Sequence, residues 1–355
     1  MSEAAEPSSP LFVGEDRRYA PGGGSLASVA AHGTLNGAPA TWQVPEEVPV
    51  AILFNTISYA VMMATPADLE DFAVGFALSE GIVASASDIS AVLVLPSGEG
   101  FAVDLSVAEA RINRARMARR ALEGRTGCGL CGIAEMADAI RMPAGRLAAT
   151  RLDPAAVTKA FDSLPLFQPM NAVNRTVHGA AWCDHTGRIE VAREDVGRHN
   201  ALDKLIGALA RIGTDYGDGF ALMSSRCSFE LVQKCAIAGI GGLATVSAPT
   251  ALALSLAREA GVQLAARAKA GVMIFERDDE PMDTKDMLRM ANQIAEAFNA
   301  YPEQEAVDET AKHIRSFWDP RMRAKLASHL AAGGAGLSAL ALKAAQALPP
   351  ARSAG

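Results

Sequence analysis

A regular alternation of strand-like and helix-like segments after residue 150 constrains the fold most. The apolar, β-prone runs IEVAREDV, GFALMSS and LATVSA lead into NALDKLIGALARI, CSFELVQKCAIAG and PTALALSLAREAG. Strands that alternate with helices of about 10–13 residues indicate a layered α/β domain with a largely parallel or mixed sheet. We therefore predict an α/β domain over residues 151–280. Ligands of such sheets bind beyond the carboxyl ends of the strands.

The segment before this domain has another pattern and predicts a smaller α+β domain over residues 41–125. Two pairs of β-prone runs flank turn-like residues at 55–58 and 97–100, so each pair predicts a hairpin. Between the hairpins, Thr65 is the expected N-cap of a helix that ends at Gly81.

The remaining segments complete the predicted organisation. Residues 1–40 are rich in Ala, Gly, Ser and Pro and are expected to be a mobile leader. An arginine-rich helix over 107–122 is expected to enter a cysteine loop and connector at 126–150. Short amphipathic stretches separated by Pro and Gly breaks predict an all-helical module over 281–355.

Charge and cysteine content exclude several classes of protein. The net charge of −7 argues against a general nucleic-acid binder, which would be basic. No apolar run is long enough for a membrane helix, and the stretch MSEAAEPSSPLFVGEDRR lacks the basic region and apolar block expected of a secretory signal. Five cysteines do not suit a disulfide framework, so we expect a cytoplasmic protein with reduced thiols.

The stretch RTGCGLCG contains a C-x-x-C pair, Cys128 and Cys131, surrounded by glycines. A zinc site is disfavoured because no second closely spaced pair exists and the deaminase pattern H-x-E with P-C-x-x-C is absent. A thioredoxin-like couple is disfavoured because that motif begins a helix in a βαβ unit.

A persulfide carrier is the third interpretation of this pair. The nearby arginines favour a thiolate, which accepts sulfur from a donor persulfide. The outer sulfur is then passed to an acceptor or attacked by the second thiol. Two small residues in a structural turn remain the alternative. The other cysteines, Cys183, Cys227 and Cys235, are expected to be packing residues.

Three strand-to-helix turns are candidate ligand sites, and each has a structural alternative. EDVGRHNALDK, with Glu194, Asp195, Arg198, His199 and Asp203, fits ligand orientation or a buried salt-bridge network. SSRCSFE fits an anion cradle or simple capping by Ser225 or Ser228. ARAKAGV, residues 266–272, fits a nucleotide-binding turn or a plain hairpin.

Taken together, these stretches resemble the formate dehydrogenase accessory sulfurtransferases, the FdhD family. The resemblance rests on AVMMATPADLEDFAVGFALSEGI, GCGLCG, REDVGRHNALDKLIG, SSRCSFELVQK and VSAPTALAL, in the family's order, and covers about residues 45–277. It implies a cytidine-deaminase-like layered core without the zinc ligands, and hence no permanently bound metal.

The resemblance also implies an activity. Family members take persulfide sulfur from a cysteine desulfurase and deliver it to the molybdenum bis(molybdopterin guanine dinucleotide) cofactor of formate dehydrogenase. In this chain Cys128 would carry the persulfide and Cys131 would be its partner. The family's guanine-nucleotide loop corresponds to the six residues Arg267, Ala268, Lys269, Ala270, Gly271 and Val272.

This chain departs from the family pattern at two places. Ala268, Ala270 and Val272 replace bulkier or charged residues, so backbone contacts to the nucleotide are expected there. In NRTVHGAAW, Arg175 and Thr176 stand where the family has paired glycines, which leaves the role of His178 open.

The C-terminal segment has a resemblance of its own. MANQIAEAF, HIRSFWDPRMRAKL and GGAGLSALALKA are similar to the small delta subunit of NAD-dependent formate dehydrogenases. We therefore expect a fusion that docks on the formate dehydrogenase catalytic subunit, because a tether raises the effective concentration. A homodimer is also expected. The alternatives to a sulfurtransferase are a non-catalytic cofactor-binding chaperone and a thioredoxin-like dithiol protein.

Overall fold

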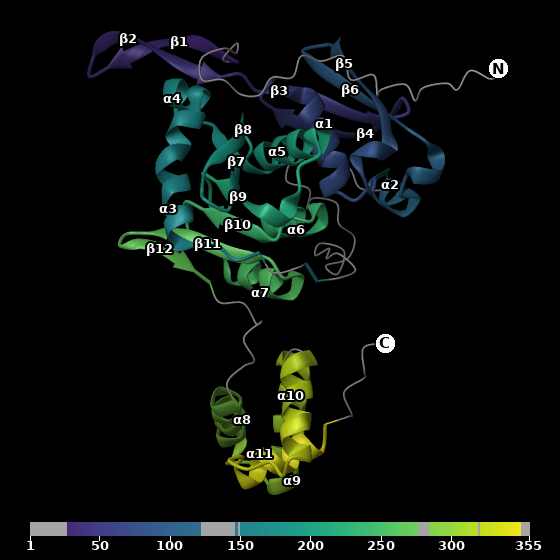
Figure 1. The fold of residues 1–355 in the computed structure, drawn as a ribbon, viewed down its shortest axis with the longest axis vertical. Coiled ribbons are helices and arrows are strands. Elements are labelled where there is room, and N and C mark those ends of the chain that lie inside the picture. The colour runs from purple at the N-terminus through teal and green to yellow at the C-terminus, as the bar shows by residue number, and fades with distance from the viewer. Residues whose placement is uncertain (1–26, 122–145, 148–149, 276–283, 319, 349–355) are drawn as a thin grey trace, which may run out of the picture. The chain divides into compact units, whose positions relative to one another are not determined.

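The computed structural model describes residues 27–121, 146–147, 150–275, 284–318 and 320–348. Cys128 and Cys131 therefore lie outside the described residues, as does most of the predicted cysteine loop. Contacts divide the chain into two compact units, Met1–Arg277 and Asp278–Gly355, which we call the N-terminal unit and the helical unit (Figure 1).

The N-terminal unit begins with a hairpin that corrects the predicted leader. β1 (Ser28–Leu35) pairs antiparallel with β2 (Ala38–Pro45) through the tight turn at Asn36 and Gly37. The two strands carry few large apolar residues, so sequence composition alone suggested a leader to residue 40. The hairpin is anchored at its base, where Ala27 packs against Met170 and Val177.

A four-stranded sheet and one helix form the next layer. The strand order is β4-β3-β6-β5, in which β3 and β6 are parallel and the other pairs are antiparallel. Both predicted hairpins are confirmed. The strands are β3 (Val48–Phe54), β4 (Ile57–Ala64), β5 (Ile89–Ser97) and β6 (Gly100–Val107). Helix α1 (Leu69–Ser79) packs its Phe72 and Phe76 against this sheet.

The alternating segment forms a six-stranded mixed sheet with the order β12-β11-β10-β9-β7-β8. The two pairs that β10 makes with β9 and β11 are parallel, and the other pairs are antiparallel. The strands are β7 (His178–Asp184), β8 (Ile189–Asp195), β9 (Gly219–Met223), β10 (Gly242–Thr245), β11 (Gln263–Ala268) and β12 (Gly271–Ile274). This confirms a mixed α/β architecture, and the specific likeness to cytidine deaminases stays a prediction.

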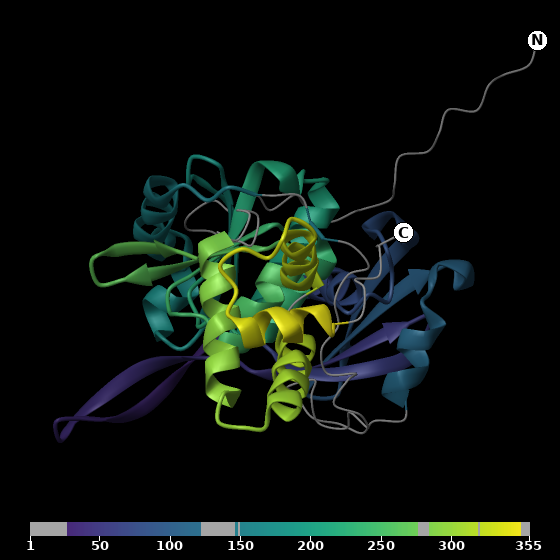
Figure 2. The same cartoon turned by 90° about the horizontal axis from the view of Figure 1, so that it is seen from below.

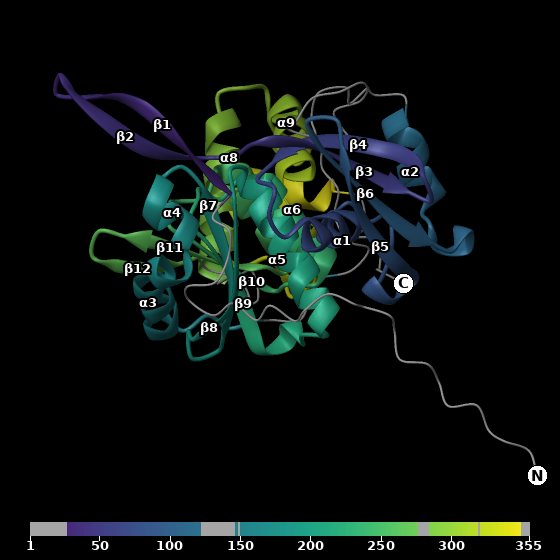
Figure 3. The same cartoon turned by 90° about the horizontal axis from the view of Figure 1, so that it is seen from above.

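Helices cover both faces of this sheet, with one apolar core on each face (Figure 3). One face carries α5 (Arg198–Ile212), α6 (Phe229–Ala238) and α7 (Ala251–Ala260). The other face carries α3 (Pro154–Ser163), and α4 (Pro169–Asn174) follows it. The hairpins β1–β2 and β11–β12 both project from one side of the unit (Figure 2).

Helices α1 and α5 join the two sheets into one unit by touching through their backbones. A Cβ atom added at Gly75 would lie 1.7 Å from the carbonyl oxygen of Asp203, and one at Gly207 would lie 1.9 Å from that of Asp71. Glycine at both positions lets the helices approach this closely. The predicted α+β and α/β segments are therefore parts of one compact unit.

The start of α1 differs from the prediction. The helix begins at Leu69 after Asp68, and Thr65 is not its N-cap. Thr65 is instead fully buried, where its backbone N donates to Asp195 Oδ2 (3.0 Å) and its Oγ1 accepts from Val196 N (3.1 Å). Through these two hydrogen bonds, Thr65 links the end of β4 to the end of β8. The arginine-rich helix is likewise shorter than predicted, because β6 occupies the chain to Val107 and α2 spans Arg114–Ala121.

The helical unit consists of α8 (Thr284–Phe298), α9 (Glu303–Phe317), α10 (Pro320–Ala331) and α11 (Ala339–Gln346). Its core contains Met287, Ile314, Trp318 and Leu326. The boundary between the units lies within a few residues of the composition break used for the predicted helical module. None of the helices in the described part of the chain has the length and apolar character needed to cross a membrane.

Candidate functional site

The topology brings the ends of several strands to one edge of the six-stranded sheet. β8, β9, β10 and β11 all run in the same direction, and β7 runs against them. The carboxyl ends of four strands, at Asp195, Met223, Thr245 and Ala268, therefore share an edge with the first residue of β7, His178. We call this edge the carboxyl edge. It is the place where α/β sheets bind ligands.

Hydrogen bonds from backbone N atoms join the turns of the carboxyl edge. Ser224 N donates to Gly179 O (2.9 Å), and Gly179 N donates to Ser224 Oγ (2.8 Å). Cys227 forms a parallel bridge with Pro249 in the next turn. These contacts join the turns after β9 and β10 to the start of β7, so the positions of the turns at this edge are fixed relative to one another.

Basic side chains gather at the carboxyl edge. The pKa of His178 is lowered from its usual value chiefly by burial and next by the charge of Arg198, while Asp195 opposes the shift. His199 and Arg226 lower the same pKa further. His178 is therefore predominantly neutral at pH 7, in a field dominated by cations.

Two carboxylates near this edge, those of Asp195 and Glu230, are already paired with basic side chains. Asp195 Oδ2 lies 2.7 Å from Lys204 Nζ, and both side chains are fully buried. Glu230 Oε2 lies 3.7 Å from His199 Nε2. Burial would raise the pKa of Glu230, but the neighbouring His199 and Ser228 lower it to about 2.

The motif EDVGRHNALDK thus divides into two parts. Asp195 and Asp203 belong to buried networks, since Lys234 Nζ lies 2.9 Å from Asp203 Oδ1 and Ser79 Oγ donates to the same oxygen at 2.6 Å. Arg198 and His199 stand at the carboxyl edge. The interpretation as a buried salt-bridge network is therefore confirmed for Asp195 and Asp203, while ligand orientation by this motif stays a prediction. The sequence analysis did not single out the buried partners Lys204 and Lys234.

Glu194 in the same motif holds a neighbouring helix. Its two carboxylate oxygens accept hydrogen bonds from the backbone N of Met170 and of Asn171, each at 2.9 Å. Burial outweighs these bonds and raises the pKa of Glu194 to about 7. Its role is to fix the start of α4 against β8.

The predicted nucleotide-binding turn lies at the end of β11 and the start of β12. Arg267 is exposed; its Nη2 lies 2.7 Å from Asp162 Oδ1 and its guanidinium lies over the ring of Phe161. Ala268, Lys269, Ala270 and Gly271 are exposed, and Val272 is half-buried. The turn therefore presents backbone and the Lys269 side chain at the carboxyl edge.

The predicted sulfur-bearing residues, Cys128 and Cys131, lie outside the described residues. The other three cysteines are buried, as expected of packing residues. Burial raises the thiol pKa of Cys183 and Cys235 far above the usual value and that of Cys227 to about 12. These three thiols are thus protonated and shielded at neutral pH.

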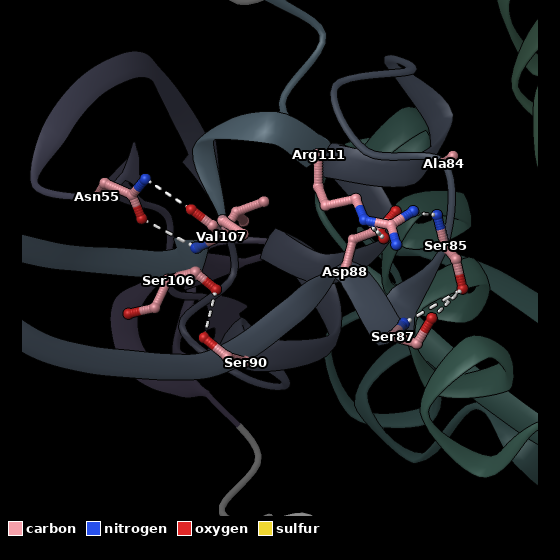
Figure 4. Close-up of a pocket in the computed structure, with 10 residues that line it drawn as sticks. Asn55, Ala84, Ser85, Ser87, Asp88, Ser90, Ser106, Val107 and Arg111 are labelled. Carbon is pink, nitrogen blue, oxygen red and sulfur yellow. Dashed lines mark hydrogen bonds and ion pairs between the residues drawn. The ribbon is translucent and has the colours of Figure 1, made fainter.

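The part of the chain that the structure describes holds no metal cluster, and two cavities in it lie away from the carboxyl edge; one, of about 730 Å³, is lined by Leu78, Ile206 and Tyr216 among others. No three His, Cys, Asp or Glu side chains there are grouped to hold a metal. A polar cavity of about 650 Å³ lies on the N-terminal sheet (Figure 4). Its polar groups bond to one another, since Asn55 pairs with the backbone of Val107 and Asp88 with Arg111.

Comparisons with known proteins give the family of most of the N-terminal unit. The model of the FdhD/NarQ family matches residues 45–279. The protein named "Sulfur carrier protein FdhD" of Chromobacterium violaceum is 50% identical over 248 residues, which cover 68% of this chain and 91% of that protein. Its namesake in Cupriavidus necator is 48% identical over 232 residues, covering 65% and 81%.

A solved structure shares the fold. The crystal structure of a putative formate dehydrogenase accessory protein from Desulfotalea psychrophila has a TM-score of 0.55 and 24% identity, over 71% of this chain and 97% of that chain.

The helical unit has a separate match, to the family described as NADH-dependant formate dehydrogenase delta subunit FdsD, over residues 286–345. The two family matches follow one another along the chain, and the point where the first ends lies within a few residues of the boundary between the two units. The chain belongs to the FdhD/NarQ family and carries, after that domain, a delta-subunit domain of formate dehydrogenase.

Proposed function

We propose that the protein is a sulfur carrier that serves a formate dehydrogenase. Cys128 takes persulfide sulfur from a cysteine desulfurase, and the sulfur passes to the molybdenum bis(molybdopterin guanine dinucleotide) cofactor, which is the substrate of the carrier. One observation carries the assignment of the thiol: of the five cysteines, three are buried with raised pKa values. Nucleophilic chemistry then falls to Cys128 and Cys131, because the thiolate is the reactive form.

The chemistry balances as two exchanges. The Cys128 thiolate attacks the outer sulfur of the donor persulfide, the donor cysteine leaves as a thiolate, and Cys128 becomes the persulfide. Attack of the Cys131 thiolate on the inner sulfur then releases hydrosulfide for the acceptor and leaves a Cys128–Cys131 disulfide. Formation of that disulfide supplies the two electrons that reduce the outer sulfur to hydrosulfide, and an external dithiol must reduce the disulfide before the next cycle.

Loss of either cysteine should remove formate dehydrogenase activity in a strain that depends on this protein. We expect Cys128→Ala and Cys131→Ala to fail to restore the activity and Cys235→Ala, a buried cysteine of α6, to restore it. Restoration by Cys128→Ala would instead favour a non-catalytic chaperone that binds the cofactor and the apo-enzyme.

The delta-subunit domain is proposed to dock the carrier on its client. The relatives named sulfur carrier proteins match the N-terminal unit, and the delta-subunit family matches the helical unit, so the fusion links a carrier to a subunit of the enzyme that would need it. A tether converts the encounter into an intramolecular event. Deleting residues 284–355 should weaken binding to formate dehydrogenase and slow its activation, and unchanged binding and activation would refute the docking role.

A further inference from the structure

The outer face of the four-stranded sheet, opposite α1, is apolar and exposed. Helix α1 packs on the inner face, where Ile52 of β3 is fully buried. On the outer face Val61 and Met63 of β4 are 59% and 46% exposed, and Leu93 and Leu95 of β5 are 52% and 47% exposed. A sheet that is covered on one face normally carries polar residues on the other. An exposed apolar face of this kind is typical of a site where a partner docks.

The strand register gives this face the shape of a trough. Val61 lies opposite Ala51 of β3, which in turn lies beside Ala102 of β6. Ala102 lies opposite Leu95 of β5. Paired residues point to the same face, so large side chains stand on the two edge strands and alanines form the floor between them. We call this surface the sheet trough, and it is formed by Val61, Met63, Leu93 and Leu95 over Ala51 and Ala102.

The width and the area of the sheet trough suit one α-helix. The strand order β4-β3-β6-β5 puts three inter-strand spacings, about 14 Å, between its walls. A helix with its side chains is about 10–12 Å across. Four large side chains, each about half exposed, present roughly 350 Å² of apolar surface, whereas a stable dimer buries about 800 Å² of each subunit. An amphipathic helix, held by a few anchors three or four residues apart, therefore fits this surface better than a second copy of the chain.

The two ends of the sheet trough differ in charge. Glu46 and Glu47 precede β3 and Glu99 precedes β6, and because β3 and β6 are parallel these three carboxylates share one end. All three are exposed, and no basic side chain among the described residues pairs with them. At the other end acids pair with arginines, as Glu109 does with Arg114 (3.3 Å). The occupant should therefore carry Lys or Arg where its helix meets the acidic end.

Strand β6, which forms part of the floor, leads toward Cys128. It ends at Val107, and α2 (Arg114–Ala121), which follows it, contacts β4. The chain between Ala121 and Cys128 can span at most about 25 Å, because an extended residue covers no more than about 3.6 Å. A sulfur donor seated in the sheet trough would thus be within reach of Cys128, while the acceptor is expected at the carboxyl edge of the other sheet.

We propose that the sheet trough is the docking site of the sulfur donor, a cysteine desulfurase. The donor lays an amphipathic helix between the walls, with its apolar face on the alanine floor and its Lys or Arg residues at the acidic end. The proposal rests on the proposed function, because a donor is needed only if Cys128 carries sulfur. Burial of the wall side chains supplies the affinity, and the charges set the orientation of the helix and the rate of encounter.

Calorimetric titration of the full chain with the cysteine desulfurase of the same organism tests the site. We expect the double variant Val61→Thr/Leu95→Gln to bind at least about tenfold more weakly, because two wall side chains lose apolar surface. Both residues are exposed in the free protein, so the variant should fold as the parent does. Leu166→Gln is the matched control, since Leu166 is a 73% exposed leucine of η4 (Leu164–Phe167), beside the other sheet. Unchanged affinity in the double variant, or no binding by the parent chain, would overturn the proposal.

Two further variants test the shape and the charge of the sheet trough. Ala102→Phe adds apolar surface but fills the floor, so it should weaken desulfurase binding at least about tenfold. Equal or tighter binding would indicate a merely adhesive surface and refute the helix. The triple variant Glu46→Gln/Glu47→Gln/Glu99→Gln should weaken binding about fivefold at low salt and reduce its salt dependence. A salt dependence equal to that of the parent would refute the orientation by charge.

Sedimentation of the same variants distinguishes a donor from a second copy of the chain. The parent and Val61→Thr/Leu95→Gln should have the same oligomeric state, because the walls contact the donor and not another subunit. A parent dimer that the double variant converts to a monomer, with unchanged desulfurase affinity, would make the sheet trough a subunit interface and refute the proposal.

Sulfur loading of Cys128 separates this proposal from the carrier function. Glutathione persulfide needs no docking surface: its outer sulfur passes to the Cys128 thiolate and glutathione leaves as a thiolate, so the parent and the trough variants should load equally. With the desulfurase, the variants should show a raised KM for the donor and an unchanged rate at saturation. A parent chain that binds the desulfurase but gains no sulfur from either source would refute the carrier function and leave the docking site standing. Equal loading of the parent and the double variant at low desulfurase concentration would refute the docking site alone.

Discussion

Replacing Gly75 or Gly207 by alanine should destabilise the N-terminal unit, although alanine is the better helix former. Both glycines lie inside helices, where alanine normally gains about 1 kcal/mol. Their Cα atoms, however, face the backbone of the other helix. The sign of the effect therefore distinguishes local helix propensity from the contact between α1 and α5.

The distances give the size of the effect. A Cβ at Gly75 would lie 1.7 Å from the carbonyl oxygen of Asp203, so the helices would have to separate by about 1.3 Å to relieve the overlap. Overpacking of a close contact costs about 1–3 kcal/mol. Separation also lengthens the buried bond between Ser79 and Asp203 and the pairing of Asp71 with Arg211. We expect a net loss of at least about 3 kcal/mol in the free energy of unfolding.

Urea unfolding followed by the fluorescence of Trp182 measures this loss. Trp182 is buried against Tyr216 in the core under α5, and Trp42 and Trp318 are replaced by Phe in the background chain so that the signal reports the N-terminal unit. Gly33→Ala is the control, because no atom lies within 4 Å of its added Cβ. It should change the free energy of unfolding by less than about 0.5 kcal/mol. A Gly75→Ala chain as stable as the parent would refute the backbone contact.

Three further predictions concern buried groups. Lys204→Met leaves Asp195 without its buried partner and should cost about 3–5 kcal/mol in urea unfolding, while Lys312→Met, which breaks an exposed pair with Glu309, should cost less than about 1 kcal/mol. Burial raises the pKa of Glu194 from 4.5 to about 7 in the folded protein, so between these two pH values the native state binds more protons than the unfolded chain. The stabilisation that Glu194 contributes is therefore present below pH 4.5 and should fall by about 3 kcal/mol as the pH rises to 7, and this pH dependence should be absent in Glu194→Gln. Alkylation by iodoacetamide at neutral pH should spare Cys183, Cys227 and Cys235 in the native protein and modify them in urea, and native labelling of any of the three would contradict their burial.

The alternating pattern predicted the α/β architecture because each strand and each helix can be recognised from the apolar residues within its own segment. The strands β8, β9 and β10 and the helices α5 to α7 lie where the sequence pattern predicted them. The composition of residues 1–40 wrongly predicted a mobile leader up to residue 40, because the β1–β2 hairpin contains few large apolar side chains. Its base packs against Met170 and Val177, which are distant in the sequence and could not be identified from local composition.

Long-range partners could not be predicted from local pattern. Thr65 has the sequence context of an N-cap but bonds to Asp195 and Val196, which lie 130 residues away. Asp195 and Arg198 belong to one sequence motif, and only the structure shows that Asp195 is buried with Lys204 while Arg198 lies at the carboxyl edge. The roles of Cys128 and Cys131 still rest on the resemblance and on the burial of the other three thiols.

The mass of Cys128 after incubation of the full chain with a cysteine desulfurase and cysteine tests the carrier function most directly. We expect a gain of one sulfur atom on Cys128, removable by a dithiol reductant, absent in Cys128→Ala and retained in Cys235→Ala. A wild-type chain that gains no sulfur, or a Cys128→Ala chain that gains as much as the parent, would contradict the account.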